Sequence, residues 1–358
     1  DISMFGLNPV KNSKCLTRPQ SIPTQLNVTK VYQTSRGTIW FIGSTVYHFN
    51  SETLQFNPIK GLYKYKISEI THNMFLTTNG KVYEYTSGSS DIQPNLIQLP
   101  FNISDEKLLN ISSIDSVRFI ITNKQVYFKG ICPTNSGLCG SKSGTITNFE
   151  KFVLPEEIDE IQQAISSKNY LIIKSKSNFY SLGESAGQLC IQTPLPYTQE
   201  FTKINSTLSN LYLGSSSVLY QTNDTFQYCG LSKEMKNGSL IIQPINKQIQ
   251  APNNVLSVGL SYDQLIFVTD SAIYTQNILM TSDLMCQIEN NHNYTNTRLA
   301  DSKDYDSVQF DGKIAYFYKQ FASTEPKFNL NIGAIIGVIM GVLIIIAFIA
   351  ISVTIVMK

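Results

Sequence analysis

The chain has 358 residues, enough for one large all-β domain or two ordinary domains, and a net charge of +2 at neutral pH. Only 15% of its residues are charged, so the chain lacks the extended basic surface that holds a polyanion. We therefore expect no nucleic-acid partner. The sequence begins at Asp1 rather than at a methionine, which indicates a removed targeting segment or a fragment.

A short phrase recurs along residues 31 to about 318: an apolar strand, a polar turn, and a pair of apolar or aromatic residues. The first two copies read "SRGTIWFIGSTVYHFN" and "THNMFLTTNGKVYEYT", and five more follow. The apolar pairs begin at Val46, Val82, Val126, Phe179, Phe226, Ile273 and Ile314. Each copy is two β-rich runs around Asn, Gly, Asp or Lys, which predicts a hairpin. Seven such hairpins, 36 to 53 residues apart, favour a radial arrangement of blades.

The repeat resembles that of the regulator-of-chromosome-condensation family. The segments "FLTTNGKVYEY", "IITNKQVYFKG" and "FYSLGESAGQLC" carry the resemblance, with Gly183, Gly187, Gln188 and Leu189 at the family's G-Q-L-G loop. The chain departs from the family pattern where Cys190 replaces the last glycine and where the aromatic-glycine pair is mostly lost. The resemblance implies an all-β, seven-bladed β-propeller. Because the last copy lacks its second half, we expect N-terminal strands to close the ring and protect its edges.

Six cysteines precede residue 300, and an even number in an oxidising compartment suggests three disulfides out of 15 possible pairings. The alternative is six buried free thiols. From their places in the aligned loops we expect Cys132 to pair with Cys139, Cys190 with Cys229, and Cys15 with Cys286 at the ring closure.

Seven sequons of the form N-x-[ST] are spread over the same region, which predicts a glycoprotein carrying N-linked glycans. They begin at Asn27, Asn102, Asn110, Asn205, Asn223, Asn237 and Asn293.

The stretch from Gly183 to Gly187 matches G-x-S-x-G, the nucleophile elbow of serine hydrolases. That elbow needs a following helix, yet Pro194 and Pro196 come soon after it. The only histidine after Ser185 is His292, beside the sequon at Asn293, where a glycan would crowd an active site. We therefore interpret Ser185 as a turn residue and predict no catalytic residue.

Other chemical motifs are incomplete. The three histidines, His48, His72 and His292, have no metal-ligand spacing, and the four aspartates between Asp301 and Gly312 do not follow the calcium-loop order. The segment "PEEIDEI", Pro155 to Ile161, is an acidic turn expected at the surface. We predict no metal and no cofactor. Most aromatic residues are expected in the core, although the loop tyrosines Tyr197 and Tyr294 are candidates for a binding face.

Residues 332–356 form 25 positions without a charge, enough for a helix of about 37 Å, longer than the hydrocarbon core of about 30 Å. The run predicts a single-pass membrane protein with its N-terminal domain extracellular or luminal, at the plasma membrane or an endomembrane. Gly333, Gly337 and Gly341 would form a packing face for another transmembrane protein. The expected parts are a propeller at 1–321, a linker at 322–331, the helix at 332–356 and a cytosolic stub at 357–358.

These features predict a non-catalytic propeller that binds a protein partner as an accessory or structural subunit of a membrane complex. The alternatives are a cell-surface adhesin or receptor for glycans or matrix, a secretory hydrolase, and a nuclear exchange factor like the best-known member of the family. Fold resemblance alone does not carry function.

Overall fold

A computed structural model describes residues 2–7, 15–22, 27–33, 39–43, 45–50, 53, 55–86, 92–167, 169–176, 178–184, 189, 197–204, 210–214, 217–222, 225–236, 239–260, 264–277, 296–311 and 314–320. All regular elements among them are β-strands. The chain divides into two units, Asp1–Phe321 and Ala322–Lys358, and the second lies outside the described residues.

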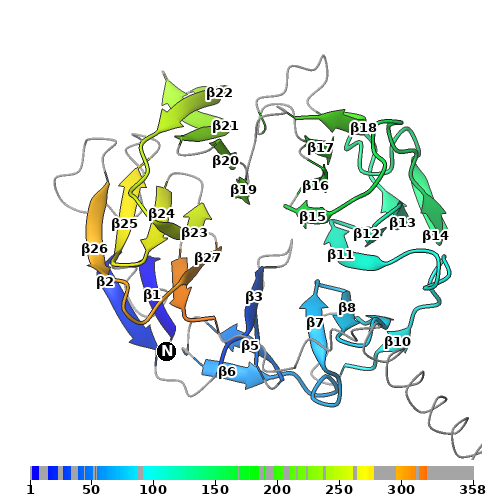
Figure 1. Cartoon of the computed structure of the whole chain (residues 1–358), viewed down its shortest axis with the longest axis horizontal. Coiled ribbons are helices and arrows are strands. Elements are labelled where there is room, and N and C mark those ends of the chain that lie inside the picture. The colour runs from blue at the N-terminus through cyan, green and yellow to red at the C-terminus, as the bar shows by residue number, and fades with distance from the viewer. Residues whose placement is uncertain are drawn as a thin grey trace, which may run out of the picture. The chain divides into compact units, whose positions relative to one another are not determined.

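The strands form four-stranded antiparallel sheets around a common centre (Figure 1). Six sheets, here called blades 1 to 6, each use four strands that are consecutive in the sequence. Blade 1 contains β3 (Lys30–Gln33), β4 (Ile39–Ile42), β5 (Val46–Asn50) and β6 (Gln55–Pro58). Blade 2 contains β7 (Ile67–Ile70), β8 (Met74–Thr77), β9 (Val82–Glu84) and β10 (Asn95–Leu96). Blade 3 contains β11 (Leu108–Ile114), β12 (Val117–Thr122), β13 (Val126–Cys132) and β14 (Gly144–Lys151).

The next three blades repeat the same order. Blade 4 contains β15 (Gln163–Ser166), β16 (Tyr170–Ser175), β17 (Asn178–Gly183) and β18 (Thr198–Lys203). Blade 5 contains β19 (Asn210–Leu213), β20 (Ser217–Thr222), β21 (Thr225–Lys236) and β22 (Ser239–Ile249). Blade 6 contains β23 (Val255–Leu260), β24 (Gln264–Thr269), β25 (Ala272–Asn277) and β26 (Thr297–Asp301).

A further sheet, the composite blade, joins the two ends of the unit. It contains β27 (Ser307–Asp311), β28 (Ile314–Tyr318), β1 (Ile2–Leu7) and β2 (Cys15–Ile22). The register of β1 on β28 runs from Ile2 opposite Tyr318 to Gly6 opposite Ile314. This pairing agrees with the expected closure by N-terminal strands, and it gives β28 a second neighbour instead of a free edge.

Hydrophobic clusters fill every junction between neighbouring blades. Ile42 and Val46 of blade 1 pack with Phe75 of blade 2, and Tyr316 of the composite blade packs with Phe41 of blade 1. The other five junctions hold equivalent clusters. The first residue of the repeated apolar pair is buried in all six copies whose side chain is described: Val46, Val82, Val126, Phe179, Phe226 and Ile273. The repeat therefore supplies the side chains that hold adjacent blades together.

Threonines close several turns between the second and third strands of a blade. Thr77, Thr122 and Thr269 end such second strands, and each hydroxyl donates to a backbone carbonyl three or four residues ahead. Backbone N–H groups in all three of these turns donate back to the same hydroxyls. The side chain thus satisfies the turn locally, which is why a polar residue is buried there.

The predicted fold class, a propeller of seven blades with one transmembrane helix, requires correction. Strand pairing divides the unit into six blades of consecutive strands and one composite blade, because the last repeat supplies only β27 and β28. Among the residues that the structure describes, no helix is long and apolar enough to cross a membrane.

The predicted single-pass localisation is corrected by the same finding. The run 332–356, its glycines Gly333, Gly337 and Gly341, the linker 322–331 and the stub 357–358 lie outside the described residues. An uncharged run sets the length that a spanning helix would have, but it does not by itself make a helix.

Candidate interaction face

Strand direction places two kinds of loop on the same face of the propeller. Each blade alternates in direction across its four strands, so the turn between its second and third strands lies beside the connection that leads to the next blade. We call this side the connection face. Figure 1 shows the blades in order around the centre, with β26 of blade 6 followed by β27 of the composite blade.

Three exposed apolar side chains lie in successive connections of this face. Tyr63, in the connection from blade 1 to blade 2, is 73% exposed, Ile103 in the next connection is 70% exposed, and Val153 in the third is 85% exposed. We call these residues the exposed triad. They have the highest exposure among the large apolar side chains of the described residues. Single exposed apolar residues are ordinary, but three in consecutive connections of one face mark a candidate interaction site.

Local turns force Tyr63 and Ile103 outward. Leu62 is fully buried, and its N–H donates to Ile59 O at 3.3 Å, while Tyr65 N–H donates to Leu62 O at 3.0 Å, so the intervening Tyr63 stands at the turn. Ile103 follows Asn102, whose Oδ1 accepts the Ser104 N–H at 3.2 Å and whose carbonyl accepts the Asp105 N–H at 2.9 Å. These two bonds close a turn, and Ile103 lies on its outer side.

Val153 is exposed because the chain alternates as it leaves blade 3. The preceding residue, Phe152, is 6% exposed, and its N–H donates to Val126 O at 2.8 Å. Phe152 packs edge-on against Phe201 of blade 4 with ring centroids 5.2 Å apart. The backbone at 152 is thereby fixed with its side chain inward, which turns Val153 to the outside.

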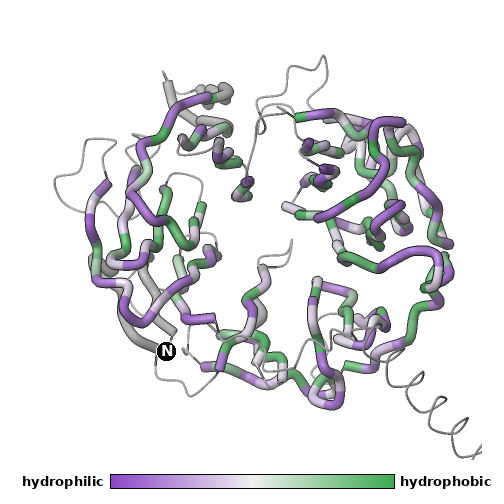
Figure 2. Tube along the Cα trace, viewed as in Figure 1, coloured by the Kyte–Doolittle hydropathy of each residue, from purple (hydrophilic) through white to green (hydrophobic). Residues whose placement is uncertain are grey.

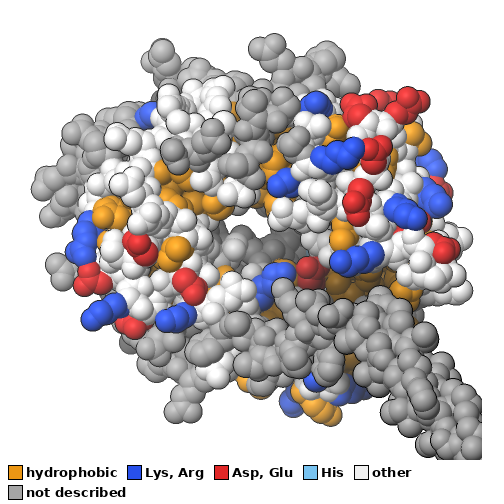
Figure 3. Space-filling model, in the orientation of Figure 1, with side chains coloured by type: hydrophobic (Ala, Val, Ile, Leu, Met, Phe, Trp, Pro, Cys, Tyr) orange, Lys and Arg blue, Asp and Glu red, His pale blue; other side chains and the backbone are white. Residues whose placement is uncertain are grey.

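The first strands of the blades surround the central opening seen in Figure 3. Lys30 of β3 and Glu69 of β7 form an ion pair between blades 1 and 2, with Nζ 3.5 Å from Oε1. The second carboxylate oxygen of Glu69 accepts the Ile111 N–H of blade 3 at 3.4 Å. One carboxylate therefore connects three consecutive blades beside the opening.

The environment of Glu69 opposes its ionisation. Burial raises the pKa of this carboxyl, and the Lys30 ammonium and the Ile111 N–H only partly offset that effect. Lys30 also lies over the ring of Tyr32, 4.5 Å from its centroid. The phenol of Tyr32 donates to Ser68 O at 2.9 Å, which adds another bond between blades 1 and 2.

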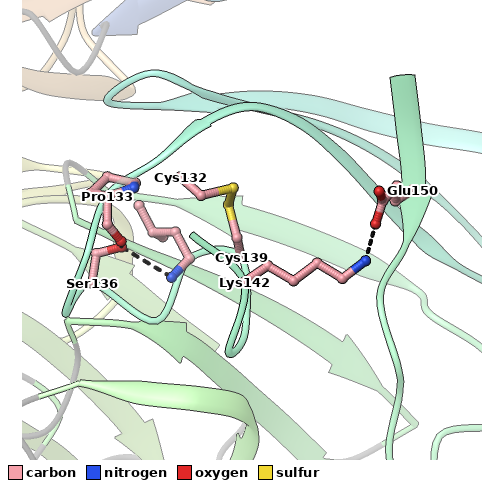
Figure 4. The surroundings of a disulfide bond; sticks show 7 residues. Cys132, Pro133, Ser136, Cys139, Lys142 and Glu150 are labelled. Carbon is pink, nitrogen blue, oxygen red and sulfur yellow. Dashed lines mark hydrogen bonds and ion pairs between the residues drawn. A yellow bond between two sulfur atoms is a disulfide. The ribbon is translucent and has the colours of Figure 1, made fainter. Parts of the chain in front are cut away.

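A disulfide between Cys132 and Cys139 closes the loop after β13, with Cα atoms 5.8 Å apart (Figure 4). This is the pair predicted as a local loop clasp. Just beyond it, Lys142 forms an ion pair with Glu150 of β14. The loop also contacts blade 4, since the hydroxyl of Tyr197, which precedes β18, donates to Asn135 Oδ1 at 3.4 Å.

The other cysteines are only partly described. Cys229 is disulfide-bonded and 1% exposed, whereas its predicted partner Cys190 lies outside the described residues. Cys15 lies in β2, in a stretch whose side chains are not described, and Cys286 lies outside the described residues. The pairings of Cys190 with Cys229 and of Cys15 with Cys286 stay predictions.

Three of the seven sequon asparagines belong to the described residues. Asn27 and Asn102 are exposed. Asn110 is half-buried, and its Nδ2 donates to Ala164 O of blade 4 at 2.8 Å. Since Nδ2 is the atom that an N-linked glycan occupies, a glycan at Asn110 would remove this bond between blades. Asn205, Asn223, Asn237 and Asn293 lie outside the described residues.

The residues weighed for catalysis or metal binding are only partly described. Ser185 and His292 lie outside the described residues, as does Tyr294, a candidate for a binding face. His48 sits in β5, where burial lowers its pKa, and His72 is 4% exposed in the first turn of blade 2. Within the described part of the chain, no three His, Cys, Asp or Glu residues are grouped as metal ligands would be.

Comparisons with known proteins bear on the fold. No protein-family model matches the chain, and no curated protein matches it. Human WBSCR16, known from a crystal structure, is 11% identical with a TM-score of 0.60, over 90% of this chain and 99% of that one. The β-propeller domain of Cps50 (Swd1) from a Myceliophthora thermophila crystal structure is 12% identical with a TM-score of 0.46, over 81% of this chain and 92% of that one.

At 11% identity the similarity to WBSCR16 concerns the fold alone. The chain is an all-β propeller built from repeats, and the regulator-of-chromosome-condensation family is not shown by these comparisons.

Sequence reasoning missed the exposed triad. Nothing in the residue types separates Tyr63, Ile103 and Val153 from the many apolar residues of the repeats. The usable signal was position, because all three fall between repeat copies rather than inside them. The sequence had instead suggested Tyr197, which in the structure is only partly exposed and bonded to the loop of blade 3.

Proposed function

We propose that this chain is a non-catalytic β-propeller that binds a protein partner through its connection face, as an accessory or structural subunit of a larger assembly. The observation that carries the proposal is the exposed triad: Tyr63, Ile103 and Val153 stand outward in three successive blade connections. Aromatic side chains such as Tyr63 are enriched among the anchors of protein interfaces, and exposed aliphatic side chains such as Ile103 and Val153 add apolar area that a partner can bury.

Specific contacts hold the backbone beside each residue of the triad. Leu62, Phe152 and the turn at Asn102 fix the backbone on either side of each anchor. Preorganised anchors bind without a large ordering cost, which favours recognition over catalysis by mobile loops. Leu256, 55% exposed at the start of β23, is a further exposed apolar side chain beside the blade 5 to blade 6 connection.

The non-catalytic part of the proposal rests on the sequence. The G-x-S-x-G stretch is followed by prolines instead of a helix, and three histidines offer few bases. The repeat's likeness to the regulator-of-chromosome-condensation family implies a propeller without identifying a partner.

Covalent features complete the proposal. We include Asn27 and Asn102 as acceptors of N-linked glycans, because both side chains are exposed. We also include the disulfides Cys190–Cys229 and Cys15–Cys286, which would tie blade 4 to blade 5 and the composite blade to blade 6.

Site-specific photo-crosslinking tests the binding face. A photoreactive phenylalanine analogue is placed at position 63, 103 or 153 of the full chain, and cells of the source are irradiated. The matched control carries the analogue at Ile131, which is 58% exposed and lies near the end of β13, on the side of the blade opposite the connections. We expect one protein to crosslink at all three triad positions and not at the control. Equal crosslinking at the control position, or three different products at the triad, would overturn the proposal.

A further inference from the structure

The connections that carry the triad differ in charge. The connection from blade 1 to blade 2 contains Lys60, Lys64 and Lys66 and no acidic residue, and all three lysines are exposed. Two connections further, the segment after Val153 contains Glu156, Glu157, Asp159 and Glu160 and no basic residue, and all four are exposed. The basic residues thus accompany Tyr63, and the acidic residues accompany Val153.

The connection between them is nearly balanced. It carries Asp105, Glu106 and Lys107 around Ile103. Both carboxylate oxygens of Glu106 already accept hydrogen bonds, one from the Thr122 hydroxyl at 2.7 Å and the other from the Tyr127 hydroxyl at 2.9 Å. Counted over the connections alone, the charge therefore changes from basic through nearly balanced to acidic along three consecutive blades, while the turns between second and third strands add Lys81, Lys124 and Lys176.

Of the charges named at the two ends, one acidic group is already in an ion pair. Asp159 forms an ion pair with Lys176, in the neighbouring turn of blade 4. No ion pair with Glu156, Glu157 or Glu160 occurs among the described residues, and the same holds for Lys60 and Lys64. Figure 3 shows acidic side chains towards the upper right, with Lys and Arg side chains among them, and Figure 2 shows a hydrophilic chain along the β14–β15 connection.

We propose that the connection face takes a bipolar partner segment, whose apolar side chains cover the triad, with carboxylates beside Lys60 and Lys64 and basic groups beside Glu156 and Glu157. This inference rests on the proposed function and adds the chemistry of the partner. Opposite charges at the two ends fix the direction in which the segment lies, because the reversed direction would place like charges together.

Solvent exposure limits what these charges contribute to affinity. Ion pairs at the surface are screened over about 8 Å at physiological ionic strength. Their main effect is on selection among partners and on the association rate, while the triad supplies the buried apolar contact.

A displayed library of random peptides, selected on the immobilised full chain, tests the inference. Wild-type protein is compared with Lys60→Glu/Lys64→Glu, with Glu156→Lys/Glu157→Lys and with all four substitutions together. A fourth variant, Tyr63→Ser/Ile103→Ser/Val153→Ser, removes the triad. These positions are exposed, so far-ultraviolet circular dichroism and the melting temperature should match the wild type for every variant.

We expect wild type to enrich peptides with an acidic block and a basic block on either side of apolar residues. The first variant should enrich basic peptides, the second acidic peptides, and the fourfold variant bipolar peptides again. Individual peptides should lose at least tenfold in affinity on the mismatched variant at low salt.

Two results would overturn the inference in distinguishable ways. Enrichment of apolar peptides that lack this charge pattern but require the triad removes the bipolar partner and leaves the proposed function standing. Enrichment that persists in the triad variant, or no enrichment on wild type, counts against both.

Discussion

Leu138 lies directly against Gly183, so the disulfide-closed loop of blade 3 contacts the end of β17 in blade 4. Gly183 has a φ of +104°, and a Cβ added there would meet Leu138 Cδ2 at 2.9 Å and Asn169 O at 2.6 Å. Leu138 itself is 2% exposed. The glycine is required both by its backbone conformation and by the close approach of its neighbours.

Replacing Gly183 with alanine should therefore destabilise the propeller by about 2 to 3 kcal/mol, from the left-handed backbone and the overpacking together. The matched control is Gly80→Ala, since Gly80 has a φ of +79° but a Cβ added there would have no neighbour within 4 Å. The control should lose only about 1 kcal/mol. Urea unfolding of both variants checks this, and equal losses would show that the contact with Leu138 contributes nothing.

The Cys132–Cys139 disulfide should stabilise the same junction. The bridge closes a short loop, with a sequence separation of 7 residues, for which the chain-entropy relation gives about 2 to 3 kcal/mol. We expect Cys132→Ser/Cys139→Ser to lower the free energy of unfolding by that amount. Added reductant should destabilise the wild type more than this variant, because the variant has one disulfide fewer to lose. An unchanged urea midpoint in the variant would contradict the prediction.

Ionisation of Glu69 should make stability depend on pH. Its pKa is raised in the folded chain by burial, so the folded state holds the proton more tightly than the unfolded state. The stabilising contribution is then fully present below the pKa of a carboxyl in the unfolded chain, and it is lost as pH rises through the higher folded value.

Comparing wild type with Glu69→Gln isolates this effect. The stability of wild type relative to Glu69→Gln should increase as pH falls from 7 towards 4, and the reverse trend would show that the Lys30 ion pair dominates. Glu160→Gln, at an exposed position on the connection face, controls for the replacement of a carboxylate by an amide. Urea unfolding at a series of pH values provides the measurement.

Glycan occupancy should differ between two neighbouring sequons. Asn102 is exposed at a turn, whereas Asn110 uses Nδ2 to hold Ala164 O of the next blade. When the chain is produced through a eukaryotic secretory pathway, we expect glycan on Asn102 and little or none on Asn110. Mass spectrometry of the glycopeptides gives the two occupancies, and Asn102→Gln provides the site-loss control. Comparable occupancy at Asn110 would mean that the bond to Ala164 is dispensable for folding.

Much of the propeller follows from the repeat, because the same residues make both the sequence pattern and the blade core. Val82 and Val126 recur in the sequence and are fully buried at equivalent places in β9 and β13. The Cys132–Cys139 pair could also be predicted, since both residues belong to one short loop.

The interaction face could not be predicted in the same way. Exposure of Val153 depends on Phe152 being held inward by Phe201, which lies 49 residues away in the sequence and in another blade. The pKa of Glu69 likewise depends on side chains and backbone from blades 1 and 3. Such features arise from contacts between repeats, so they cannot be predicted from the residue pattern within one repeat. The transmembrane assignment failed differently, because it relied on length and hydropathy alone.

The exposed triad should be dispensable for folding although it is apolar. Tyr63→Ser, Ile103→Ser and Val153→Ser should each change the free energy of unfolding by no more than about 0.5 kcal/mol, since these side chains are already in water. Val126→Ala, at a fully buried position of the repeat, should cost about 2 kcal/mol and serves as the comparison.

Urea unfolding measures stability, and capture of the crosslinked partner measures binding. We expect the triad variants to keep stability and lose capture, and Val126→Ala to lose stability and keep capture in proportion to its folded fraction. A large loss of stability in the triad variants would mean that these residues belong to the core, and the assignment of the connection face as a binding surface would then fail.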